Sequence, residues 1–193
     1  MDERQPKILV LGIGNILWAD EGFGVRTLER FHALFRTAPN VSLLDGGTQG
    51  LYLVQFVEEA DYLLVFDAID YGLTPGTMKI VQGDEVPKFT GAKKMSLHQT
   101  GFQEVLSAAD LLGAYPEKLA LIGCQPLDLE NWGGTLTEPV REKLDQAAEV
   151  AAVILEQWGA PCVRRGADES VEPLLGNDID LASYEKFSEL TPQ

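Results

Sequence analysis

Three side chains of this sequence have the types of a metal site that leaves coordination positions open. Glu21 and Asp67 supply carboxylates, and His98 supplies an imidazole. Two carboxylates and one imidazole suit a borderline divalent metal, and a three-ligand set keeps positions free for a substrate or a water. The residue types do not name the metal. Each residue also has a structural interpretation, because acids cap helices and turns and a lone histidine often serves packing.

Asp45 and Asp20 are two further acids that could take part in chemistry. Asp45 begins an Asp-Gly-Gly-Thr segment, which is also typical of a turn, and Asp20 directly precedes Glu21. An aspartic-protease pair is excluded, because those enzymes combine two Asp-Thr/Ser-Gly loops and this sequence has neither that order nor a second copy. Asp20 and Glu21 stand before a predicted helix. One acid is enough to cap that helix, so the other is free to face a crevice.

The elements that must position these residues alternate between strand and helix. Continuous apolar runs predict strands buried on both faces, and apolar residues at helical spacing predict helices between them. The predicted strands are Lys7–Gly12, Val41–Leu44, Tyr62–Phe66, Thr77–Val81 and Leu119–Cys124. The predicted helices cover residues 25–35, 51–57, 102–112 and 138–158, the last two with caps at Thr100 and Thr137. This order predicts an α/β fold, a three-layer α/β/α sandwich around a mostly parallel sheet of about five strands.

The carboxyl ends of the parallel strands predict where a ligand binds, because ligands of such sheets occupy the crevice beyond those ends. The segments that follow the predicted strands are residues 12–21, 45–48, 67–70 and 125–128. Glu21 and Asp67 fall within them, and His98 stands two residues before the predicted cap of a helix. We therefore expect Glu21, Asp67 and His98 at or near one crevice edge.

Length and composition indicate one domain with its own core. The chain has 193 residues, of which 45% are apolar. We expect residues 1–160 to form a single α/β domain. Residues 168–193 hold seven acids and one lysine, so we expect residues 161–193 to be an acidic, loosely ordered tail. No apolar run approaches the ~20 residues that span a bilayer, and residues 8–13 are too short for a signal-peptide core. The expectation is a cytoplasmic protein without membrane insertion.

The net charge of −15 excludes partners that need a basic surface, namely nucleic acid and anionic membranes. No nucleotide is expected either. Leu17 stands where a dinucleotide fingerprint needs Gly or Ala, two acids follow it, and no Gly-Lys-Ser/Thr phosphate loop is present. The two cysteines, Cys124 and Cys162, match no metal or redox spacing, and we expect them to be buried or incidental thiols.

Four ordered blocks of this sequence resemble those of the maturation endopeptidases of nickel–iron hydrogenases. The blocks are GIGN followed by DEGFGV (12–25), DGGTQG (45–50), DAIDYG (67–72) and MSLHQ (95–99). They occur in order between about Lys7 and Trp158, and four ordered blocks are far more specific than one short motif. Details at residues 18–19, 70–72 and 93–95 are similar to the subgroup that serves membrane-bound uptake hydrogenases.

This resemblance implies a function for the predicted catalytic domain. Members of the family remove a C-terminal peptide from the hydrogenase large-subunit precursor after nickel insertion, cleaving after a His or Arg near the Cys-x-x-Cys motif that ligates nickel. The resemblance implies that Glu21, Asp67 and His98 contact nickel (Ni2+), which the substrate's own active site supplies. Either nickel acts in cleavage, or it only docks the substrate, with Asp45 or Glu21 as general base. A non-catalytic nickel-checkpoint or chaperone protein for the same precursor is the alternative.

Overall fold

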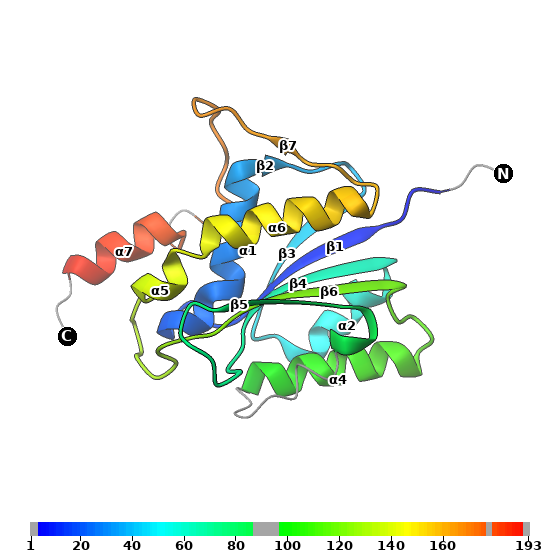
Figure 1. Cartoon of the computed structure of the whole chain (residues 1–193), viewed down its shortest axis with the longest axis horizontal. Coiled ribbons are helices and arrows are strands. Elements are labelled where there is room, and N and C mark those ends of the chain that lie inside the picture. The colour runs from blue at the N-terminus through cyan, green and yellow to red at the C-terminus, as the bar shows by residue number, and fades with distance from the viewer. Residues whose placement is uncertain (1–3, 87–96, 177–178, 191–193) are drawn as a thin grey trace.

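A five-stranded, mostly parallel sheet forms the centre of the protein (Figure 1). The structure is a computed structural model that describes residues 4–86, 97–176 and 179–190, and of residues 97–100 and 187–190 it describes the backbone alone. The strands are β1 (Ile8–Ile13), β3 (Val41–Gly47), β4 (Tyr62–Ala68), β5 (Met78–Gln82) and β6 (Lys118–Cys124). They lie in the order β3-β1-β4-β6-β5, and all pair in parallel except β5, which pairs antiparallel with β6 at the edge.

Helices cover both faces of the sheet and complete three layers (Figure 1). One face packs against α1 (Phe23–Leu34) and α6 (Leu144–Gln157), and the other against α2 (Val54–Glu58) and α4 (Leu97–Leu111). Each strand serves both cores because its side chains alternate between the faces. In β4, Leu64 and Phe66 point to the α1 face, whereas Leu63 and Val65 point to the α4 face. The predicted α/β/α sandwich is confirmed.

Short elements complete the described chain. They are the 3-10 turns η1 (Ala19–Gly22), η2 (Gly50–Leu53) and η3 (Gly83–Glu85), the helices α5 (Glu138–Arg141) and α7 (Leu181–Leu190), and the strands β2 (Phe35–Arg36) and β7 (Val163–Arg164). The two short strands pair antiparallel with each other, away from the main sheet. Within residues 4–86, 97–176 and 179–190, no helix has the length and apolar character needed to cross a membrane.

The predicted helix over residues 138–158 is two helices, because a turn at residues 142–143 separates α5 from α6. Thr137 precedes α5 as predicted, but its hydroxyl donates to Asp20 and makes no bond to the helix. The start of α5 is thus fixed to a segment near the N-terminus, whereas α6 packs along α1. The chain turns between the two helices because α5 is bonded to Asp20 at its start whereas α6 packs against α1.

The described part of the C-terminal tail is bonded to α1. Arg26 and Glu29 form an ion pair one turn apart on α1. Arg26 Nη1 donates to the Ile179 carbonyl at 2.7 Å, and Glu29 Oε1 accepts from the Leu181 amide at 2.9 Å. The pair therefore holds one carbonyl and one amide at the start of α7, which lies beside α5 in Figure 1.

Both cysteines are free thiols of low reactivity. Burial raises the pKa of Cys124 to about 12 and that of Cys162 to about 11, so the thiolate is scarce at neutral pH. We expect the native protein to leave Cys124 unmodified by a thiol reagent such as DTNB and to react slowly at Cys162. Both should react at once in denaturant. Rapid modification of two thiols in the native protein at pH 7.5 would contradict this placement.

Candidate active site

The ends of four parallel strands and the loops that follow them form a crevice. β1 lies between β3 and β4, with Gly12 paired to Asp45 of β3 on one side and to Phe66 of β4 on the other. β6 continues the sheet beside β4, where Asp67 pairs with Gly123. The residues just beyond these pairs therefore meet at one edge, as the sequence predicts.

Two glycines let η1 and the start of α1 lie directly on these strand ends. A side chain at Gly24 would bring its Cβ within 2.2 Å of the Ile13 carbonyl oxygen and 2.3 Å of that of Phe66. Gly14, at φ +130°, approaches so closely that a Cβ would lie 1.8 Å from the Glu21 carbonyl oxygen. This close contact places Glu21 over the ends of β1 and β4.

Asp67 is the buried carboxylate of the crevice. Its side chain is 3% exposed, and by the alternation of β4 it lies on the face that α4 covers. Burial raises its pKa well above the ordinary value, the Ala68 amide partly offsets this rise by donating to the carboxylate, and the nearby charge of Glu21 adds to it. Glu21 therefore lies near enough to Asp67 for its charge to act on that carboxylate.

His98 lies in the first described turn of α4, which begins by Leu97. The predicted helix cap at Thr100 is therefore wrong, because Thr100 is already inside the helix. The helix covers the face of the sheet to which Asp67 belongs. The side chain of His98 lies outside the described part of the chain. Among the side chains that are described, no three His, Cys, Asp or Glu residues form a metal-binding group.

Asp45 lies at the same crevice edge but on the α1 face of the sheet. One carboxylate oxygen accepts from the Gly47 amide at 2.9 Å. Burial raises the pKa of Asp45, and the Gly47 amide and the charge of Arg26 partly offset the rise. The structure thus brings Glu21 and Asp67 together, whereas the charged neighbour of Asp45 is Arg26.

Arg26 is a residue that sequence reasoning missed. It is only 2% exposed, and its Nη2 has no hydrogen-bond acceptor among the described residues. Its guanidinium lies over the Tyr184 ring at 5.4 Å. An arginine on a helix is ordinarily solvated. The one available signal was its position between the apolar residues Val25 and Leu28, on the buried side of α1.

Asp20 has a structural role that the sequence did not reveal. It is fully buried, and Gly22 precedes α1 without any side-chain cap, so the expectation that one of the two acids caps the helix is wrong. Asp20 instead accepts from the amides of Leu127 at 2.8 Å, Asp128 at 3.0 Å and Thr137 at 2.7 Å. This carboxylate fixes the loop after β6 to η1 and leaves Glu21 as the acid that faces the crevice.

Gln125 fixes the neighbouring loop after β4. Its Oε1 accepts from the amides of Tyr71 and Leu73, and its Nε2 donates to Asp70 at 3.0 Å. A hollow of about 280 Å³ lies between these two loops. Its lining residues are Asp70, Gln125, Pro126, Leu127, Asp128, Leu129 and Glu130. The crevice therefore has a hydrogen-bonded wall with acidic residues along it.

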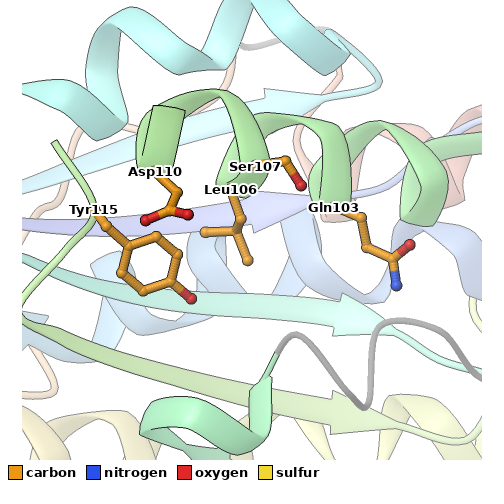
Figure 2. A pocket seen from close by; sticks show the side chains of 5 residues that line it. All are labelled: Gln103, Leu106, Ser107, Asp110 and Tyr115. Atoms are coloured by element: carbon orange, nitrogen blue, oxygen red, sulfur yellow. The ribbon is translucent and has the colours of Figure 1, made fainter. Parts of the chain in front are cut away.

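A separate hollow of about 410 Å³ lies beside α4 (Figure 2). Gln103, Leu106, Ser107 and Asp110 line it from the helix, and Tyr115 lines it from the segment after the helix. Burial and the charges of Asp84 and Asp110 raise the pKa of Tyr115, so its hydroxyl stays protonated at neutral pH. Of the predicted site residues whose side chains the structure describes, namely Glu21, Asp45 and Asp67, none lines this hollow.

Comparisons with known proteins find relatives of this chain in sequence and in structure. A sequence model of HycI, described as hydrogenase maturation protease, matches residues 25–154. The hydrogenase expression/formation protein HupD of Rhizobium leguminosarum bv. viciae is 67% identical over 184 residues, which cover 95% of this chain and 91% of that protein. HupD of Bradyrhizobium diazoefficiens is 66% identical over 183 residues, covering 94% of this chain and 95% of the relative.

A solved structure is also similar over most of its length. The hydrogenase maturating endopeptidase HybD from E. coli matches with a TM-score of 0.78 and 39% identity, covering 82% of this chain and 98% of that one. The family predicted from the four sequence blocks is confirmed. This chain belongs to the hydrogenase maturation protease family.

Proposed function

We propose that this protein is a nickel-dependent endopeptidase that cuts the hydrogenase large-subunit precursor after nickel insertion and removes its C-terminal peptide. The cut follows a His or Arg near the Cys-x-x-Cys nickel ligands of the precursor, and the reaction takes place in the cytoplasm. Membership of a protease family supports hydrolysis of a peptide bond. The dependence on nickel and the position of the cut are the new parts of the proposal.

One observation carries the nickel part: a buried carboxylate, Asp67, lies within electrostatic reach of Glu21 at the crevice. Two adjacent carboxylates repel each other, and burial penalises the ionised form further. A cation that arrives with the substrate relieves both effects. We assign Glu21, Asp67 and His98 to contact the nickel-bearing part of the precursor. Carboxylates and an imidazole hold nickel less tightly than the precursor's thiolates, so the metal stays with the substrate.

The positions of the other crevice residues suggest their roles in cleavage. Nickel bound in the precursor supplies a Lewis acid beside the scissile bond. Asp45 and Glu21 are the two candidates for a general base that takes a proton from the attacking water. Asp45 is held in place by the Gly47 amide, and the positive charge of Arg26 favours its ionised form. Asp20 and Gln125 fix the crevice loops without touching the substrate.

Mass spectrometry of a cognate precursor incubated with this protein tests the proposal. We expect a defined C-terminal loss from nickel-loaded precursor and none from nickel-free precursor. Glu21→Gln should reduce the rate by about 100-fold, since it removes a charge that faces the metal. Glu104→Gln is the matched control, because Glu104 is exposed on α4, and it should leave the rate unchanged.

Three results would change the proposal. Equal cleavage of nickel-free precursor would remove the nickel dependence and leave the protease. Binding of nickel-loaded precursor without cleavage would favour a nickel-checkpoint protein. A Glu21→Gln variant that cuts at the wild-type rate would remove Glu21 from the site.

A further inference from the structure

The loops around the crevice expose several large apolar side chains. At least one follows each of the four parallel strands, and together they are Leu17, Leu51, Tyr52, Leu73, Leu127 and Trp132. Trp132 is 57% exposed and Leu127 is 58% exposed. Clustered apolar groups that remain in water beside a functional crevice mark a surface for recognition.

Three of these residues, Leu17, Leu127 and Trp132, form with the half-buried Trp18 a surface that is here called the Trp132 platform. The rings of Trp18 and Trp132 meet edge to face with centroids 5.1 Å apart. The Gly133 amide donates to the Leu17 carbonyl at 2.7 Å, and an antiparallel bridge joins the two tryptophan residues. The two segments of the platform are therefore held together by backbone bonds as well as by ring contact.

Buried hydrogen bonds fix the platform to the body of the protein. Asp20 accepts from the Leu127 and Asp128 amides, and its own amide donates to the Asp128 carbonyl at 3.0 Å. The exposed ring of Trp132 thus belongs to a segment that buried hydrogen bonds hold on the body of the protein. Rigid aromatic groups bind a partner with little loss of side-chain entropy, which favours a role in recognition.

The platform is continuous with the candidate active site. The Glu21 amide donates to the Trp18 carbonyl at 2.9 Å, so the platform ends one turn before the crevice acid. Two further acids, Asp128 and Glu130, lie on the same loop as Trp132. A ligand that covers the platform is therefore adjacent to negative charge on both sides.

The negative charge around the Trp132 platform indicates which kind of ligand binds there. A second copy of this chain fits poorly, because a two-fold contact would set these acids of a protein with net charge −15 against their own equivalents. A peptide that carries a basic residue next to apolar residues fits both features, since the base meets the acids and the apolar side chains meet the rings. The precursor segment in the proposed function has a His or Arg at the cut.

We propose that the Trp132 platform binds apolar side chains of the precursor's C-terminal segment and thereby sets which peptide bond reaches Glu21 and Asp67. This inference rests on the proposed function, because it names the part of that substrate which the platform recognises. Trp132 is accordingly a specificity residue outside the reacting atoms. Removal of the Trp132 side chain weakens binding of the substrate and of the transition state equally, so KM rises and kcat is unchanged.

Steady-state cleavage of nickel-loaded precursor by three variants tests the platform. Trp132→Ala should raise KM by about 10- to 30-fold, in the range of a buried aromatic contact, with kcat within about 3-fold of wild type. Trp132→Phe should recover most of the loss. Leu111→Ala is the matched control, since Leu111 is an apolar side chain 88% exposed at the far end of α4, and it should change nothing.

Each contrary result has a distinct meaning. Wild-type KM in a folded Trp132→Ala variant, alongside an active wild-type protein, overturns the platform and leaves the proposed function intact. A dimer seen by light scattering that dissociates on Trp132→Ala also overturns it, by assigning the surface to self-association. If Trp132→Ala unfolds, the platform is tested instead by the KM of Trp132→Phe and by the binding of the precursor to that variant. A wild-type protein that neither binds nor cleaves the precursor refutes the proposed function itself.

Discussion

Asp20→Ala is expected to lower the melting temperature by roughly 8–15 °C, corresponding to a loss of about 3–5 kcal/mol at this chain length. The substitution leaves the amides of Leu127, Asp128 and Thr137 without the acceptor that the buried carboxylate supplies. A buried donor without a partner destabilises the fold by about 1–3 kcal/mol. Because these bonds also fix the crevice wall, cleavage should fall as well, even at temperatures where the variant is folded.

Thermal unfolding followed by circular dichroism measures this effect. Asp110→Ala is the matched control, because Asp110 is an exposed acid on α4, and its melting temperature should equal that of the wild type. Asp20→Asn should lie between the alanine variant and the wild type, because its carbonyl oxygen still accepts from some of these donors whereas its NH2 group faces the others. A change of less than about 2 °C in both Asp20 variants would show that the loop after β6 does not depend on this carboxylate.

Asp67→Asn is expected to slow cleavage strongly and to stabilise the metal-free protein. Loss of the buried charge should reduce the cleavage rate by about 100-fold or more. The same change removes the desolvation of a carboxylate and its repulsion from Glu21, and asparagine can still accept from the Ala68 amide. We expect the melting temperature at pH 7.5 to rise by roughly 2–6 °C.

The pH dependence of this gain has a defined sign. The pKa of Asp67 is raised in the folded state, so the folded protein keeps a proton that the unfolded chain releases at lower pH. Stability from this group therefore falls as the pH rises from the ordinary aspartate value towards the raised value. The difference in melting temperature between Asp67→Asn and wild type should be small near pH 4 and larger near neutrality. Asp110→Asn is the control, because Asp110 is exposed, and its difference from wild type should not change with pH. A variant less stable than wild type at all pH values would contradict this account.

Much of the fold could be predicted from local pattern. Apolar runs located all five strands of the sheet, and their alternation with helices predicted the three layers. The direction of β5 was not predicted, because an apolar run carries no sign of direction. The length of the connection held that information: residues 69–77 are too few for the crossover that a parallel neighbour requires, so β5 returns antiparallel.

The site was predicted to the extent that topology alone places it. Glu21 follows β1 and Asp67 lies near the carboxyl end of the neighbouring strand β4, so the rule about strand ends was enough to bring them together. The role of Asp20 was out of reach, because its partners at Leu127 and Thr137 lie more than 100 positions away in the chain. Arg26 was missed for the same reason, since the carbonyl of Ile179 that binds it belongs to the tail.

The strand order has a consequence for synthesis on the ribosome. β6 lies between β4 and β5, although it is made after both. One side of β4 therefore has no pairing partner until residues 118–124 emerge, and at ~5–20 residues per second the intervening residues take roughly 2–10 s. β4 is almost wholly apolar, and an unpaired apolar strand recruits strands from other chains. The nascent chain is thus most prone to aggregation in that interval, and slow translation between β4 and β6 would lengthen it.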